Sequence, residues 1–150
     1  MNKFKNKFNA RTDVDQRQAG TRSERAVADE LPKIVFNFKD FDPAQIPPGQ
    51  SFLDWQKGEN TADLFEKLRQ LSALNITEAQ QQRMITIYGE FPVGSKFRVP
   101  KFMQNPTERV NWAAIKKVGG QKARIAGHVI GNVFYIVFLD ADHLFYPSEK

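Results

Sequence analysis

The sequence predicts an α+β fold with a small antiparallel sheet, in the order strand, helix, helix, three strands, and with the helices packed on one face of the sheet. Two observations lead to this prediction. Leucines recur at three- and four-residue spacing between residues 61 and 74, which is the period of an amphipathic helix. Near the C-terminus two apolar runs flank Gly131-Asn132, a residue pair that favours a tight β-hairpin.

The first 31 residues differ in composition from the rest of the chain. They are polar and mixed in charge, and no apolar period is sustained among them. Segments of this kind bury too little apolar surface to offset the entropy of ordering the chain. We therefore expect residues 1–31 to form a disordered arm that is basic and polar. Residues 32–150 have the length of one domain, and we expect a single α+β domain there.

The predicted domain begins with a strand, a proline-rich turn and a short capped segment. In the run IVFNF at residues 34–38, the first, third and fifth side chains share one face, as in a strand with one buried side. The prolines of DPAQIPPGQ, residues 42–50, cannot continue a hydrogen-bonded ladder. The run SFLD at residues 51–54 then predicts a capped turn or a short helix.

Two helices are expected next. In TADLFEKLRQLSAL, residues 61–74, the leucines and Phe65 form one apolar stripe, and Asn60 or Thr61 can cap the first turn. The sequence TEAQ, which begins at Thr77, has the S/T-x-x-E/Q form of a capping box. It predicts a second, shorter helix directly after the first.

The second half of the chain is expected to supply most of the sheet. Residues 84–91, MITIYGEF, alternate as a strand does, and a basic loop with several prolines follows. Residues 109–118, RVNWAAIKKV, fit a strand or a helix, and we favour a strand because the hairpin after it needs a neighbour. The hairpin pairs residues 122–130 with residues 133–140. Its second arm is apolar on both faces, which is typical of a central strand.

The composition excludes several classes of protein and site. The chain has no cysteine, so disulfides, thiolate nucleophiles and cysteine-bound metals are excluded, and a cytoplasmic location is expected. The longest apolar run, Val133 to Leu139, is far shorter than the ~20 residues that cross a bilayer. We therefore expect no membrane partner.

A metal site at the end of the hairpin is a further possibility. Asp140, Asp142 and His143, with His128, are residue types that bind divalent ions. Their spacing, however, matches no recognised ligand signature, and both aspartates suit the solvent-exposed end of a strand. The sequence therefore predicts neither a metal nor another cofactor.

Basic charge is concentrated just before the hairpin. The chain has a net charge of +5, and residues 96–124 contain eight basic residues against Glu108 alone. Such a concentration favours a polyanionic partner, above all nucleic acid, although a solvated basic surface has the same composition. The basic residues that we expect to contact RNA are Lys96, Arg98, Lys101, Lys116, Lys117 and Lys122.

Metal-independent cleavage of RNA requires residue types that this region contains. The 2′-hydroxyl needs a base, the leaving oxygen needs an acid, and cations must stabilise the charge that builds up on the phosphate. Arg124 begins the hairpin, and His143 and Tyr146 follow it, so these three are the candidate catalytic residues. In the alternative interpretation, His143, Phe145 and Tyr146 only pack the last segment against the sheet.

The segment RIAGHVIGNVFYIVFLDADHLFY, residues 124–146, resembles the RelE superfamily of bacterial toxin–antitoxin ribonucleases, and its YafQ branch most of all. The resemblance implies that His143 is a catalytic acid or base, that Phe145 is its aromatic neighbour on the RNA, and that Arg124 stabilises the phosphate. It further implies an endoribonuclease (mRNA interferase) that cuts mRNA in the ribosomal A site and is neutralised by a cognate antitoxin protein.

Two alternatives remain open beside that resemblance. ParE-like members of the superfamily keep the fold but act on gyrase, so a non-enzymatic protein that binds a protein partner or a nucleic acid is the second hypothesis. His128 lies four residues after Arg124 on the same predicted strand face. It is therefore a second histidine that we expect to contact RNA.

Overall fold

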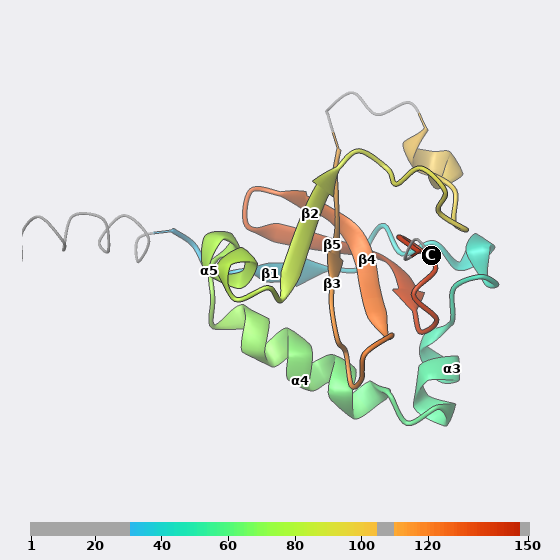
Figure 1. The fold of residues 1–150 in the computed structure, drawn as a ribbon, viewed down its shortest axis with the longest axis horizontal. Coiled ribbons are helices and arrows are strands. Elements are labelled where there is room, and N and C mark those ends of the chain that lie inside the picture. The colour runs from blue at the N-terminus through green and yellow to red at the C-terminus, as the bar shows by residue number, and fades with distance from the viewer. Residues whose placement is uncertain (1–30, 105–109, 148–150) are drawn as a thin grey trace, which may run out of the picture. The chain divides into compact units, whose positions relative to one another are not determined.

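The computed structural model describes residues 31–104 and 110–147. Residues from Lys33 onward form one compact unit, in which helices accompany a single sheet (Figure 1). The predicted α+β class is thereby confirmed. The arm predicted for residues 1–31 lies outside the described residues, apart from Leu31.

The elements of the described residues follow the predicted order, but one helix and one strand more are present than in the order strand, helix, helix, three strands. The extra helix begins in the capped run at residues 51–54, and the extra strand lies in the alternating run at residues 84–91. The strands are β1 (Val35–Asn37), β2 (Ile85–Gly89), β3 (Asn111–Ile115), β4 (Arg124–Ile130) and β5 (Val133–Asp140). The α-helices are α3 (Phe52–Lys57), α4 (Thr61–Ser72) and α5 (Ile76–Gln81), and the 3-10 helices are η1 (Pro43–Gln45) and η2 (Lys101–Met103).

The sheet is mixed and not wholly antiparallel. Its strand order is β1-β5-β4-β3-β2, and β1 pairs parallel with β5, whereas the other three pairs are antiparallel. The helices carry the chain from one edge of the sheet to the other, and β2 to β5 then return in a meander. The last strand therefore arrives beside β1 in the same direction. Nothing in the local pattern of residues 34–38 indicates a partner about a hundred residues away.

Capping side chains define where two of the helices begin. Ser51 and Asp54 form a capping box at α3, as the run SFLD predicts. At α5 the box is formed by Asn75 and Glu78, so the prediction that it begins at Thr77 is wrong by two residues. Asn75 accepts the same backbone hydrogen bond that a threonine would, and it is the better N-cap residue.

The helices cover one face of the sheet with a large apolar core. Its buried residues come from α4 and from alternate positions of the strands; among them are Ile34, Leu64, Leu68, Leu71, Ile115, Ile125, Phe134, Ile136 and Leu139. Phe65 was expected in this apolar stripe, but its side chain is 61% exposed. It lies one position after Leu64, which places it at the side of the helix away from the sheet.

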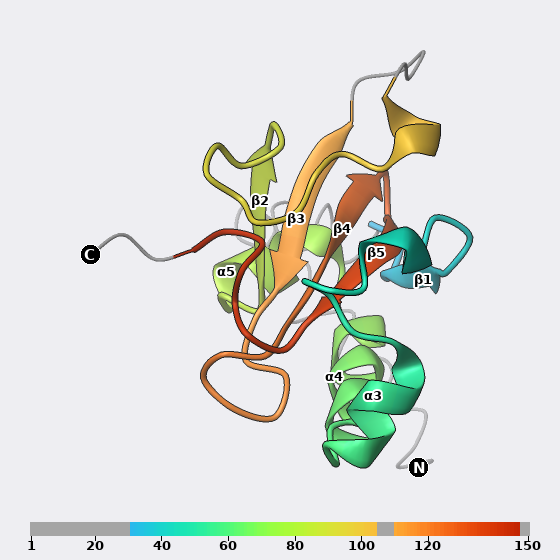
Figure 2. The same cartoon turned by 90° about the vertical axis from the view of Figure 1, so that its right-hand side faces the viewer.

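The opposite face of the sheet is covered without any α-helix. The loop after β2 and the segment after β5 run across it (Figure 2), and their apolar side chains form a second buried cluster: Phe97, Met103, Trp112, Ala126, Val137, Phe138 and Phe145. Both faces of β5 are thus covered, which confirms that it is a central strand. The polar groups described below lie at the margins of this second face.

Gly127 offers a test of this sheet. The register between β4 and β5 shifts at Gly127, and a Cβ there would collide with the backbone oxygen of Tyr135. Because backbone cannot move aside cheaply, Gly127→Ala should destabilise the protein by more than about 2 kcal/mol in urea unfolding. In the control Gly58→Ala, the nearest atom is 3.4 Å from the new Cβ, and the loss should stay below about 1 kcal/mol. Equal losses would contradict the close approach.

Candidate functional site

The register of the hairpin brings the candidate residues to one end of the sheet. Arg124, the first residue of β4, lies opposite Asp140, the last residue of β5. Lys116 follows the paired residues Ile115 and Ile125, so it lies in the same row across the strands. The segment that carries His143 begins directly after Asp140. This end of the second face is the candidate site.

Asp140 controls the path of the chain after β5. Its carboxylate is fully buried and accepts hydrogen bonds from the backbone nitrogens of Leu144 and Phe145, both at 2.8 Å. His143 within this turn has a left-handed backbone, with φ of 61°, which is uncommon for a residue with a side chain. The prediction that Asp140 ends the strand in solvent is therefore wrong.

Burial makes Asp140 an unusual carboxyl group. The loss of hydration raises its pKa above 3.8, and the two backbone N–H groups oppose that change only in part. Desolvation favours the neutral form of an acid, whereas N–H donors favour the charged form. The side chain is thus committed to holding the turn, and it is not available as an exposed ligand.

The turn brings His143 into the electrostatic field of Arg124. His143 is partly buried, and its pKa is lowered below 6.5, first by burial and then by the positive charge of Arg124. Lys122 lowers this pKa further, whereas Asp140 raises it. The imidazole is therefore neutral near pH 7 and able to accept a proton. Two residues that the sequence separates by 19 positions therefore interact electrostatically.

Arg124 has donors that the described part of the protein does not use. Its Nε and Nη1 atoms are buried, and neither has a hydrogen-bond partner among the described residues. Buried donors without partners are rare in proteins. A guanidinium group presents its donors as a planar fork that fits a phosphate or carboxylate. The position is therefore suited to an anion.

Two tyrosines border the same site. The rings of Tyr88 and Tyr146 stack with their centroids 4.4 Å apart and an angle of 10° between their planes. Burial raises the pKa of Tyr88, and the Arg124 charge lowers it to a smaller extent, so the phenol keeps its proton at neutral pH. Tyr146 is 47% exposed. Tyr88 carries no signal in the sequence, because its strand shows only an ordinary alternation.

The predicted RNA-contacting lysines and arginine fall into two groups. Lys116 and the exposed Lys122 lie near Arg124. The pKa of Lys116 is lowered, first by burial and then by the charge of Arg124. Lys117 is exposed beside them. The other group is exposed on the loop after β2, and consists of Lys96, Arg98 and Lys101.

Two other predicted RNA contacts are inaccessible in the structure. Phe145 is 1% exposed and lies in the second apolar cluster, where its ring meets Phe91 at 5.3 Å. His128 is 3% exposed. It lies four residues from Arg124 along β4, a Cα separation of roughly 13 Å at ~3.3 Å per residue. Both side chains are buried at the second face of the sheet, so neither can contact RNA in this structure.

His128 belongs to a separate buried pair. Its Nε2 atom is 2.9 Å from a carboxylate oxygen of Asp40, and its ring stacks on Tyr135 at 4.7 Å. Burial, together with the charge of Lys39, lowers the pKa of His128 more than Asp40 raises it. Burial acts to raise the pKa of Asp40, but the hydrogen bonds and charges of Lys39 and His128 together leave that pKa lowered. Neutral His128 therefore donates through Nε2 to an ionised Asp40.

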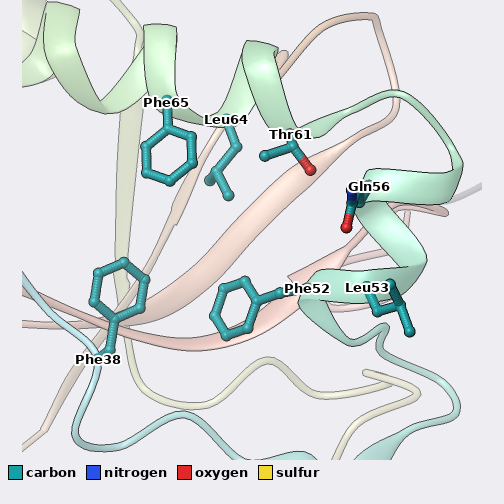
Figure 3. Close-up of a pocket in the computed structure, with 7 residues that line it drawn as sticks. All are labelled: Phe38, Phe52, Leu53, Gln56, Thr61, Leu64 and Phe65. Carbon is teal, nitrogen blue, oxygen red and sulfur yellow. The ribbon is translucent and has the colours of Figure 1, made fainter.

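An apolar groove of about 320 Å³ opens elsewhere, between α3, α4 and the end of β1. Figure 3 shows the rings of Phe38, Phe52 and Phe65 around it, with Leu64 next to Phe65 on α4. Exposed apolar patches of this kind mark interaction surfaces. The groove is lined by no titratable side chain, so it offers no acid–base chemistry.

The remaining findings concern membranes, metal ions and known proteins. None of the described helices combines the length and the apolar character that crossing a membrane requires. Residues 31–104 and 110–147 contain no group of three or more histidines, cysteines or acidic residues that could hold a metal ion. Comparisons with protein-family models, with curated proteins and with solved structures give no match.

The Asp40–His128 pair should make stability depend on pH. Both folded-state pKa values are lowered, so the stabilisation is present at neutral pH and is lost as the pH falls through those values. For His128 the loss begins below 6.5. We expect Tm to fall from pH 6.5 to about 5, and His128→Gln, which keeps an amide donor for Asp40, to flatten this slope.

His143→Gln is the matched control for this measurement. The pKa of His143 is lowered too, but the side chain is less buried, so its removal should flatten the Tm profile less than His128→Gln does. Parallel profiles for the wild type and His128→Gln would show that the buried pair does not govern stability in this range.

Proposed function

We propose that the protein is a metal-independent endoribonuclease that cleaves RNA through attack of a 2′-hydroxyl on the adjacent phosphate. One observation carries the proposal: Arg124 has two buried guanidinium nitrogens without partners in the described residues, and it lies in the field of a neutral histidine, His143. An anion-binding fork and a proton acceptor are the two groups that this reaction needs first.

The positive groups would hold the reacting phosphate. Arg124 donates to the non-bridging oxygens, and Lys116 and Lys122 add positive charge at the same end of the sheet. Negative charge increases on these oxygens as the 2′-oxygen attacks, so donors fixed in place stabilise the transition state more than the bound RNA. Partial burial of Arg124 strengthens this effect, because less water screens its charge.

The proton transfers are assigned to His143 and Tyr146. His143 takes the proton of the 2′-hydroxyl while a bond forms between the 2′-oxygen and phosphorus. The bond from phosphorus to the 5′-oxygen breaks, and Tyr146 donates its phenolic proton to that oxygen. The stacked ring of Tyr88 holds Tyr146 in place. The products are a 2′,3′-cyclic phosphate and a free 5′-hydroxyl, and both side chains recover their protonation states through solvent.

The resemblance to RelE-like toxins extends the proposal to a substrate and a partner. The RNA would be mRNA on the ribosome, and a cognate antitoxin would inhibit the enzyme. The alternative function is that of a non-enzymatic binding protein on the same fold, and the apolar groove is the observation that favours it. Growth arrest that persists in His143→Gln, with an intact transcript pool, would favour this alternative over the ribonuclease.

Substitution at the candidate site tests the chemistry directly. With a labelled single-stranded RNA, His143→Gln should lower the cleavage rate by about 10²–10⁴-fold because the base is lost. Arg124→Ala should lower it by about 10²–10³-fold because the phosphate loses its donors. His128→Gln is the matched histidine control and should keep near wild-type activity at pH 7.5 and 25 °C. Unchanged cleavage in both site variants would refute the assignment.

The pH dependence and the metal requirement provide an independent test. Because the pKa of His143 is lowered, the acidic limb of kcat/KM should have its midpoint below 6.5, and activity should rise with pH through that limb. EDTA should leave the rate unchanged, and mass spectrometry should find cyclic phosphate ends. Loss of cleavage with EDTA and its return with a divalent ion would contradict the mechanism.

A further inference from the structure

A second cavity lies between η1 and the loop after β2. Its volume is about 260 Å³, and it is separate from the apolar groove of Figure 3. The residues of its lining that bear on its chemistry are Asp42, Gln45, Arg98, Lys101, Phe102 and Gln104. Unlike the groove, it combines cations, a carboxylate, amides and an aromatic ring. We call it the Phe102 pocket.

One buried side chain joins the two walls of the Phe102 pocket. The amide of Gln45 donates to the backbone oxygen of Arg98 and accepts from its backbone nitrogen, both at 2.7 Å. This pairing reproduces one rung of a β-ladder between segments 53 residues apart in sequence. Gln45 is itself buried. The pocket is therefore built by the fold and does not depend on a chance position of surface side chains.

The rim of the pocket is suited to a nucleotide. The Phe102 ring is 57% exposed, and an exposed ring beside cations is the arrangement that stacks bases of single-stranded nucleic acids. Arg98 and Lys101 are exposed next to it, where they can reach phosphate oxygens. A lipid tail or an apolar peptide would leave the charges of Asp42, Arg98 and Lys101 without partners, so neither fits this pocket.

The carboxylate of Asp42 decides how a nucleotide would lie. It is buried in the lining, where it accepts from the backbone nitrogen of Ala44 at 3.1 Å and from the side-chain amide of Gln45 at 2.9 Å. Its negative charge repels a phosphate inside the pocket, and each oxygen keeps a further lone pair for a donor. The base therefore enters, with an amino group toward Asp42, and the phosphate stays at the rim with Arg98 and Lys101.

The loop connects the Phe102 pocket to the candidate site. The backbone nitrogen of Lys96 donates to the oxygen of Leu144 at 3.0 Å, and Leu144 directly follows His143. Arg98 lies two residues further along the loop, which is at most about 7 Å of chain. The loop that carries Arg98 is therefore hydrogen-bonded to the segment that carries His143, and this bond links the pocket to the candidate site.

We propose that the Phe102 pocket binds a nucleotide of single-stranded RNA that flanks the scissile bond, a substrate assignment that rests on the proposed ribonuclease function. The pocket selects bases with an exocyclic amino group. It makes no contact with the reacting phosphate, and it contributes affinity and base preference.

The test measures binding of intact RNA. In the His143→Gln background, fluorescence anisotropy follows a labelled single-stranded decamer at 0.1 M salt. Adding Phe102→Ala should weaken binding by about tenfold, within the range found for one stacked base. Phe65→Ala is the matched control, because Phe65 is an equally exposed phenylalanine on α4, and it should change the affinity by less than about twofold. Thermal melting checks that both variants are folded.

Two further arms test the charges. Lys101→Ala should reduce the slope of log K against log salt by about 1, whereas Lys57→Ala on α3 should not. Oligo(C) and oligo(A) should bind more tightly than oligo(U), which has no amino group, and Asp42→Asn should reduce that difference. Equal affinities for the Phe102→Ala, Phe65→Ala and parent proteins would overturn the proposal, as would an equal loss of affinity for duplex RNA.

The two proposals can fail separately. If the wild type cuts RNA and Phe102→Ala binds RNA as the parent does, the pocket assignment is wrong and the ribonuclease stands. If the wild type does not cut RNA but binds it through Phe102 and Lys101, the catalytic proposal is wrong and the pocket stands as a site of RNA binding.

Discussion

The hydrogen bonds from two backbone nitrogens to the Asp140 carboxylate are the interaction on which the second face of the sheet depends. By binding Leu144 and Phe145, this side chain turns the chain back over the second face, where the ring of Phe145 meets Trp112 of β3. The turn inserts Phe145 into the second apolar cluster and gives the loop after β2 a hydrogen-bond acceptor at Leu144. It also places His143 in the field of Arg124. One buried carboxylate thus supports both packing and the candidate site.

Burying that carboxylate costs hydration free energy, and for the same reason the pKa of Asp140 is raised. A carboxylate away from water is disfavoured unless donors replace its hydration, and two N–H groups replace only part of it. A similar condition holds at Arg124, whose buried nitrogens lack partners in the described residues. Polar groups left in this state are more common at binding sites than in cores that only stabilise a fold. The second face therefore has an aromatic core, and polar groups at its edge lack some of their hydrogen-bond partners among the described residues.

Local sequence patterns were sufficient for most elements of the fold. Leucine spacing predicted α4, alternation predicted β2, and Gly131-Asn132 predicted the turn of the β4–β5 hairpin, because each depends on residues close in sequence. The same patterns could not reveal the parallel pairing of β1 with β5. They also gave Phe65 a buried position, since a periodic stripe shows which residues share a helix face but not how wide the covered part of that face is.

For the candidate site, the sequence by itself determined the residue types: a histidine after the hairpin, an arginine at its start, and basic residues in the segment before it. Which of them lie together was decided only by tertiary structure. Because of the strand register and the turn at Asp140, Arg124 interacts electrostatically with His143 and with Tyr88. The covering of the second face buries His128 and Phe145. The reason is physical: a side chain's burial and charge environment depend on segments that are distant in sequence and that only folding brings into contact.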